Sequence, residues 1–115
     1  MKRILLIIAG AWLGTLCFAP DCSAAAEPKP IKIGAIFSVT GQASFLGAPE
    51  AKTARMLVDK INAEGGVLGQ KLELVLKDSG GSPEKAVSFA KQLIEEDKVL
   101  AIIGPSTSGE TLQIK

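Results

Sequence analysis

The sequence predicts an α/β fold, a three-layer sandwich in which helices cover both faces of a parallel sheet. Three apolar segments of strand length, 31–39, 71–77 and 99–103, alternate with longer segments whose apolar residues recur at helical spacing. The start of a further helix follows at 110–115. Strands joined by helices run parallel through right-handed crossovers, so the predicted order is β-α-β-α-β-α.

The first strand is predicted over residues 31–39, with apolar side chains on both faces. One face carries Ile31, Ile33 and Ala35. Ile36 adds apolar bulk to the other face, because successive side chains of a strand alternate in direction. Thr40 and Gly41 are typical of the turn that follows.

The first helix is predicted to begin near Pro49, which suits a first helical turn, with Glu50 well placed for the helix dipole. Its apolar stripe consists of Ala54, Leu57, Val58 and Ile61. The helix is expected to end after Asn62, with Gly65 in the left-handed conformation of a C-terminal cap.

The second strand, 71–77, alternates between apolar and more polar residues, which favours a position near a sheet edge. The next helix has a strong start, with Ser82 as N-cap, Pro83 as first helical residue and Glu84 in the first turn. Its predicted apolar stripe consists of Ala86, Phe89, Ala90, Leu93 and Ile94.

The third strand, 99–103, is continuously apolar, which predicts burial on both faces. With a 2-1-3 strand order, the loops at 38–47 and 104–109 meet at the carboxyl edge of the sheet, where open α/β folds bind ligands. Both loops are rich in Gly, Ser and Thr, and the second leads into a helix that begins near Glu110.

The first 26 residues form a predicted secretory signal peptide. Two basic residues precede an uncharged run at 4–19, and Ala24 and Ala26 fit a cleavage site after residue 26. A membrane anchor is the first alternative, but the run is shorter than the roughly 20 residues that a spanning helix needs. A lipoprotein is the second, but neither Cys follows the small residue that lipidation requires.

Composition excludes several classes of function. The chain has 115 residues, no His and a net charge of +1. Catalytic sets and zinc sites built on His are therefore excluded, and no basic stripe for nucleic acid is present. Both Cys residues lie within the predicted signal peptide, so no thiol chemistry or disulfide is expected in the remainder. We predict no cofactor and no metal.

The loop at 104–109 differs from a P-loop at one essential residue. The motif needs Lys where this chain has Glu110, which would repel phosphate, and Pro105 removes one N–H donor. A single carboxylate suits this hydroxyl-rich loop better as a ligand. The alternative is that these residues only form a turn and a helix cap.

Asp78, at the carboxyl end of the second strand, has two interpretations. It bonds its own turn, or it lies near the ligand cleft. A general acid/base pair of Asp78 and Glu110 is a further alternative, although nothing in their spacing supports it.

Several segments resemble the periplasmic leucine/isoleucine/valine-binding proteins, which are solute receptors of ABC importers. They are IKIGA at 31–35 and INAEGGVLGQKLEL at 61–74, followed in order by Asp78, Pro83 and IIGP at 102–105. The resemblance implies the type I periplasmic-binding fold, whose two lobes close on the ligand. Residues 27–115 are then an incomplete N-terminal lobe of a longer protein.

The resemblance also implies a ligand site. In this family a Ser hydroxyl and backbone N–H groups of the loop after the third strand hold the amino acid's carboxylate. The matching residues are Ser108, with Thr107, Gly109 and Ser106 beside it. The side-chain pocket is matched by Phe45 or Leu46, where the family often has a Tyr that this chain lacks. The family's ammonium-binding residues match positions past Lys115.

The implied function is an extracytoplasmic solute-binding protein of an ABC importer. The protein is expected to be no enzyme and to bind a branched-chain or related amino acid or amide. It is expected to act in the periplasm as a monomer and to pass its ligand to a membrane permease. It has no nucleic-acid partner. The alternatives are a sensory receptor ectodomain of the same fold, anchored by an uncleaved first segment, and a secreted α/β enzyme with catalytic residues past Lys115.

Overall fold

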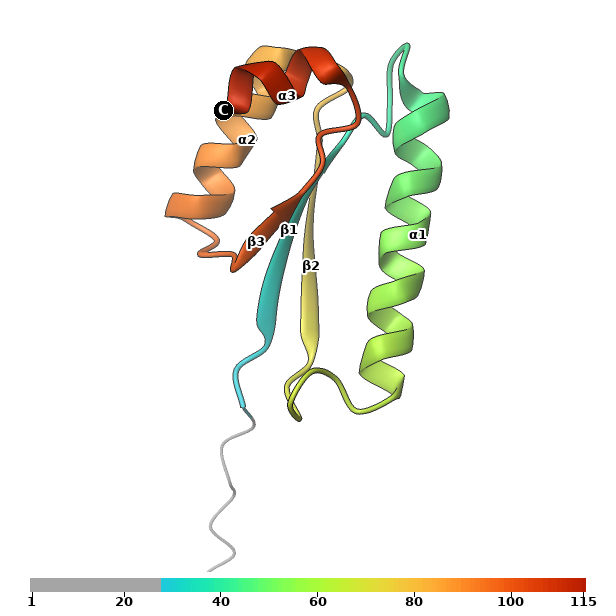
Figure 1. The fold of residues 1–115 in the computed structure, drawn as a ribbon, viewed down its shortest axis with the longest axis vertical. Coiled ribbons are helices and arrows are strands. Elements are labelled where there is room, and N and C mark those ends of the chain that lie inside the picture. Colours follow the sequence, from blue (N-terminus) through green and yellow to red (C-terminus); the bar gives the residue numbers. More distant parts are fainter. Residues whose placement is uncertain (1–27) are drawn as a thin grey trace, which may run out of the picture.

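A computed structural model describes residues 28–115 and confirms the β-α-β-α-β-α order (Figure 1). The signal peptide predicted over 1–26 lies outside these residues and stays a prediction. The elements are β1 (Ile31–Phe37), α1 (Ser44–Ala63), β2 (Leu72–Asp78), α2 (Pro83–Glu95), β3 (Ala101–Ile103) and α3 (Ser108–Ile114). None of these helices has the length and apolar character to cross a membrane.

The three strands form one parallel sheet in the predicted order, β2-β1-β3. The β1–β2 register runs from Ile31 opposite Leu72 to Phe37 opposite Asp78. β3 pairs with three residues of β1 only, from Ile33 to Ala35. β2 is therefore an edge strand, as its alternating pattern predicted, and all three strands end at the same edge.

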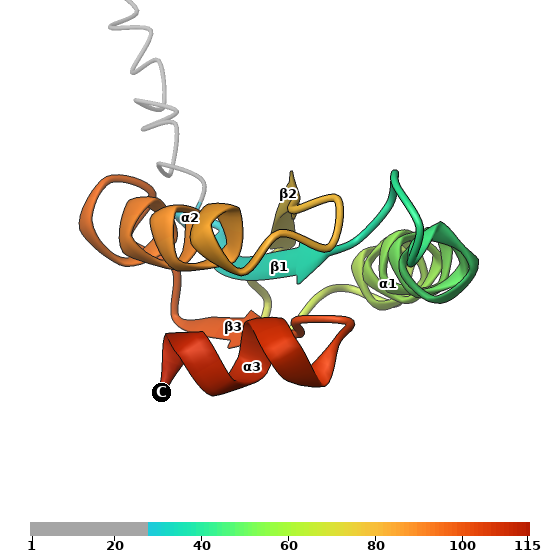
Figure 2. The same cartoon turned by 90° about the horizontal axis from the view of Figure 1, so that it is seen from above.

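The helices cover both faces of the sheet, which confirms the three-layer sandwich (Figure 2). On one face Ile36 packs against α2 in a buried cluster with Ala86, Ala90 and Leu93. On the other face Ala35 and Phe37 pack with Ala51 of α1. The alternation predicted for β1 thus fills a core on each side of the central strand.

The prediction that the first helix begins near Pro49 is wrong, because α1 begins at Ser44 and Pro49 lies inside it. The Ala43 carbonyl accepts from the N–H groups of Leu46 and Gly47, at 3.0 and 3.2 Å, and this turn continues into the helix. Gly47 is buried against the backbone of Ser38 at the end of β1. This tertiary contact, which the local pattern does not reveal, adds the first turn.

The end of α1 follows the prediction. Gly65 has a positive φ of 103°, and its N–H donates to the Asn62 carbonyl at 3.3 Å. The next N–H, from Gly66, donates to the Ile61 carbonyl at 2.8 Å, which completes a Schellman motif. The Asn62 side chain also pairs with the backbone of Leu72, donating at 2.8 Å and accepting at 2.7 Å. The helix end is thereby attached to the open edge of β2.

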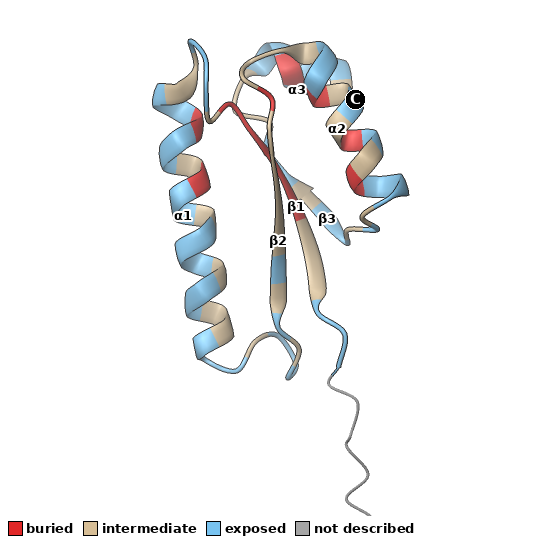
Figure 3. Ribbon diagram, turned by 180° about the vertical axis from the view of Figure 1, so that it is seen from behind, coloured by how far each residue is buried: buried red, intermediate tan, exposed pale blue. Residues whose placement is uncertain are grey.

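Figure 3 shows how buried and exposed residues are distributed over the elements. Four large apolar residues predicted in the core are exposed, namely Leu57, Ile94, Leu100 and Ile103. Ile94 of α2 is 60% exposed, because Leu93 takes the inward position at that level of the helix. Leu57 of α1 and Ile103 of β3 are about half exposed and face a cleft between these two elements. β3 is therefore not buried on both faces as predicted, because this cleft separates Ile103 from α1.

Both cap residues of the later helices are hydroxyl residues. Ser82 caps α2 as predicted, with its hydroxyl accepting from the Lys85 N–H at 3.4 Å. α3 begins at Ser108, two residues before the predicted start at Glu110, because Thr107 is its N-cap. Glu110 therefore lies in the first turn of α3, where its side chain is completely buried.

Candidate functional site

The loops that follow the three strands meet at the carboxyl edge of the sheet, as the strand order predicts. Each loop contributes hydroxyl residues close to the edge: Ser38 after β1, Ser79 after β2, and Ser106 and Thr107 after β3. Ser38 and Ser79 are completely buried, and their hydroxyl oxygens lie 3.4 Å apart. Buried hydroxyls need hydrogen-bond partners, and Ser38 finds one in the carboxylate of Glu110.

Glu110 joins two of these loops. Its Oε2 atom accepts from the hydroxyl of Ser38 at 3.1 Å and from that of Thr107 at 2.6 Å. Its own N–H donates to the Thr107 hydroxyl at 3.4 Å, so residue and cap bond reciprocally at the start of α3. One buried carboxylate thus connects the end of β1 to the loop after β3.

Two effects oppose each other on the pKa of Glu110. Burial raises the pKa, but the surrounding hydroxyls of Ser79, Thr107 and Ser38 lower it and outweigh burial. The pKa lies below its ordinary value, so Glu110 is an anion at neutral pH and an acceptor only.

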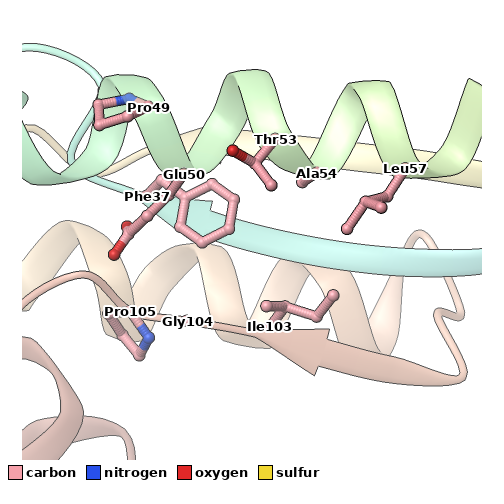
Figure 4. A pocket seen from close by; sticks show the side chains of 9 residues that line it. All are labelled: Phe37, Pro49, Glu50, Thr53, Ala54, Leu57, Ile103, Gly104 and Pro105. Atoms are coloured by element: carbon pink, nitrogen blue, oxygen red, sulfur yellow. The ribbon is translucent and has the colours of Figure 1, made fainter.

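Ser106 is held by a second carboxylate. Its hydroxyl accepts from the Ser38 N–H at 3.1 Å and donates to Oε2 of Glu50. Glu50 extends from α1 toward the loop after β3 (Figure 4). The predicted dipole partner of α1 therefore has another role, because it ties α1 to the loop at 104–107.

Asp78 bonds its own turn, as in the first of its two interpretations, and it also bonds Thr40 in the loop after β1. Its Oδ1 accepts from the N–H of Gly80 at 3.0 Å and of Thr40 at 3.2 Å, and its Oδ2 accepts from the Thr40 hydroxyl at 2.8 Å. Burial raises its pKa, but these hydrogen bonds together lower it more. Asp78 and Glu110 share no hydrogen-bond partner within residues 28–115, which leaves the acid/base pair without support.

Three predicted ligand residues come together at one hollow of about 310 Å³, and Gly109 follows them in the chain. Ser106, Thr107 and Ser108 line it, together with Pro105, Thr111 and Leu112. Ser108 and Gly109 are exposed, whereas Ser106 and Thr107 are half-buried. Among residues 28–115 the Ser108 hydroxyl has no hydrogen-bond partner, which leaves it available to a ligand.

The structure does not bring Phe45 and Leu46 to this hollow. The prediction placed them in the loop after the first strand, but both lie in the first turn of α1, for the reason given above. Phe45 is 74% exposed and Leu46 is 39% exposed.

A larger cleft of about 550 Å³ lies between α1 and β3, and the sequence reasoning missed it (Figure 4). Its lining is mostly apolar and includes Phe37, Ala54, Leu57 and Ile103, with Glu50 and Pro105 toward the loop. One feature of the sequence could have indicated this cleft: the third strand is short, yet it supplies apolar residues. Within residues 28–115, no group of three or more acidic, Cys or His side chains is placed to hold a metal ion.

Acid is expected to destabilise the edge of the sheet. For both Asp78 and Glu110 the pKa in the folded protein is lowered, so the unfolded chain takes up protons first as the pH falls. Their contribution is therefore complete well above the ordinary carboxyl pKa and is lost as the pH falls through the folded pKa. The urea midpoint should drop between pH 7 and pH 3. It should drop less in the Asp78→Asn/Glu110→Gln double variant, and an equal drop would contradict this account.

A family model for periplasmic binding proteins matches residues 30–115. The "Leu/Ile/Val-binding protein BraC3" of Rhizobium johnstonii is 35% identical over 102 residues, which is 89% of this chain and 26% of that protein. Among solved structures, the branched-chain amino acid transporter substrate-binding protein LivJ of Streptococcus pneumoniae, in complex with isoleucine, has a TM-score of 0.72 and 40% identity. That match covers 74% of this chain and 24% of LivJ.

The leucine-binding protein LivK of Thermotoga maritima is also similar, with a TM-score of 0.65 and 33% identity over 73% of this chain and 23% of LivK. The chain thus spans about a quarter of the length of the relatives that it matches.

Proposed function

The chain belongs to the periplasmic binding protein family, as its resemblance predicted, and we propose that it is part of a receptor delivering branched-chain or related amino acids to an ABC permease. The family consists of substrate-binding proteins and not of enzymes. The observation that carries the proposal is the match of nearly the whole described chain to relatives named for leucine, isoleucine and valine binding.

The ligand carboxylate is proposed to bind at the hollow beside α3. Ser108 would donate its hydroxyl, and Thr107, which also lines the hollow, and the neighbouring Gly109 would contribute through the backbone. The exposure of Ser108 and its unused hydroxyl support this role. Ser106 lines the same hollow, but its only hydroxyl proton already goes to Glu50, so it shapes the site. Phe45 and Leu46 are exposed apolar side chains available to cover the ligand's side chain.

The proposed location is the periplasm, reached through cleavage after Ala26, and the protein is proposed to act as a monomer. The basic start, the apolar run and the small residues of 1–26 support export. Sequencing the N-terminus of the mature protein separates this proposal from an anchored sensory receptor. A protein that begins near Glu27 supports the soluble receptor, whereas retention of Met1 would favour the anchored form.

Ligand binding is tested with the natural full-length protein and calorimetry. L-isoleucine, L-leucine, L-valine, other amino acids, small amides and urea are titrated in turn. We expect saturable binding of at least one branched-chain amino acid. A folded protein that binds none of these compounds would refute the transport proposal.

Ser108→Ala is expected to weaken amino-acid binding by roughly 1–3 kcal/mol, because the ligand carboxylate loses a hydroxyl donor in a partly desolvated site. Calorimetry on the full-length variant measures the change. Ser88→Ala is the matched control, since Ser88 is an exposed serine on α2 outside the loop at 104–109. An affinity for Ser108→Ala equal to that of the control would remove Ser108 from the site.

A further inference from the structure

The three consecutive hydroxyl residues at 106–108 differ in the acceptors to which they donate their hydroxyl protons. A hydroxyl has one proton to donate. The proton of Ser106 goes to Glu50, and that of Thr107 goes to Glu110. Ser108 alone of the three is exposed, and its hydroxyl has no partner in the described part of the chain.

We propose that Glu110 is a positioning residue of the ligand loop, which withdraws the Thr107 hydroxyl from the ligand and fixes the loop to the end of β1. The part of this inference that concerns a ligand rests on the proposed function. The inference explains why Ser108 is the hydroxyl that remains available to that ligand. Glu110 itself does not contact the ligand, since its side chain is completely buried.

The chemistry of a buried carboxylate gives the network a fixed direction. An ionised carboxylate only accepts, so the hydroxyl protons of Ser38 and Thr107 must both point toward Glu110. Ser38 is at the same time joined to the loop through its N–H, which donates to Ser106 at 3.1 Å. Two carboxylates, Glu50 and Glu110, therefore hold the loop from opposite elements, α1 and α3.

A neutral amide at position 110 would not impose this direction. Both hydroxyls donate to Oε2 of Glu110, so only the single amide oxygen of Gln can replace it, without the charge. The donating NH₂ group then lies where Oε1 is buried with no hydrogen-bond partner in the described part of the chain. Glu110→Gln keeps the size of the side chain, so it tests the charge and the acceptor pattern and not the filling of space. Hydrogen bonds to an ionised group are also about twice as strong as neutral ones.

The matched control is Glu84→Gln. Glu84 lies in the first turn of α2 and accepts from the Ser82 hydroxyl at 2.8 Å, which is the same chemistry at another helix start. It is exposed and has no bond to the loop at 104–109 within residues 28–115. A general effect of removing a first-turn carboxylate would therefore affect both variants alike.

Two readouts on the natural full-length protein test the proposal. Hydrogen exchange without ligand measures the order of residues 106–110 relative to β1, and calorimetry measures the dissociation constant for L-isoleucine. In Glu110→Gln we expect loop exchange to rise and binding to weaken, each by about tenfold, as the charge-assisted bonds are lost. In Glu84→Gln we expect both to stay within about twofold. If Glu110→Gln behaves like the control, the proposal is overturned.

A double-mutant cycle shows whether Glu110 acts through Thr107. Thr107→Val removes the hydroxyl at nearly constant volume, and it should loosen the loop as Glu110→Gln does. Adding the second change to the first should have little further effect, because residues of one network are not additive. Fully additive changes would contradict the proposal. If Glu110→Gln does not fold, Thr107→Val alone is compared with Glu84→Gln, by the same criteria.

Failure of the inference and failure of the proposed function are distinguishable. If the wild-type protein binds no amino acid, the proposed function fails, and loop exchange without ligand still decides the role of Glu110. If isoleucine binds and Glu110→Gln changes neither readout, only the positioning role fails.

Discussion

Gly47→Ala is expected to destabilise this domain by about 3 kcal/mol or more, at the upper end of what overpacking costs. A Cβ atom at Gly47 would lie 2.3 Å from both the carbonyl carbon and the oxygen of Ser38, and 2.6 Å from its nitrogen. These are backbone atoms, so no rotation of a side chain relieves the contact. The end of β1 or the first turn of α1 has to move.

The same substitution is expected to disturb the loop at 104–109, where we propose that the ligand carboxylate binds. Ser38 is the residue that bonds Ser106 through its N–H and Glu110 through its hydroxyl. A shift of its backbone therefore changes both connections that hold the loop after β3. Amino-acid binding by the full-length variant should weaken even at temperatures where the protein remains folded.

Native-state hydrogen exchange of the β1 amides in the full-length protein measures the loss of stability, because the core strands open only with the domain. Gly109→Ala is the control for stability. Gly109 lies in the first turn of α3, and an added Cβ would meet nothing within 4 Å. We expect this control to be neutral or stabilising, since Ala favours a helix over Gly. Equal losses in the two variants would show that contact with Ser38 is not the cause.

The strands and their order were predictable because the signals for them are local. Alternation at 31–37 and 72–78, the cap at Ser82 and the glycines after Asn62 each specify one element within a few residues. Strands joined by helices then leave few topologies. The fold class therefore followed from patterns that need no knowledge of distant contacts.

The missed features depend on contacts between distant parts of the chain. The first turn of α1 forms where Gly47 meets Ser38, and the half-exposed Ile103 follows from the short pairing of β3. The sequence marks Glu110 as the residue that departs from the P-loop motif and as a candidate acid/base partner of Asp78, but not as a residue that holds the loop. Its partner Ser38 lies 72 positions away, and no pattern within either segment indicates that they meet. The meeting of the loops at the carboxyl edge of the sheet was thus predictable, but the carboxylates that hold the loop after β3 were not.

Leu93→Ala is expected to destabilise the domain by about 2–5 kcal/mol, the range for large-to-small changes in a core. Leu93 is completely buried and packs with Ile36, Ala86 and Ala90 between β1 and α2. Ile94→Ala is the matched control, because Ile94 is the next residue of α2 and is 60% exposed. Exchange of the β1 amides should separate the two variants clearly, and comparable losses would contradict this assignment of the core.

Gly34 offers a sharper test of the same contact. A Cβ atom at Gly34 would lie 2.9 Å from Cδ1 of Leu93 and 3.2 Å from Cγ2 of Val99, so Gly34→Ala alone is expected to destabilise the domain. In the Leu93→Ala background the added methyl group enters the space that Leu93 leaves. The double variant should therefore lose less stability than the sum of the single variants, by about 1 kcal/mol or more. Strict additivity would mean that the side chain of Leu93 does not pack over Gly34, and that the core of this face is arranged differently.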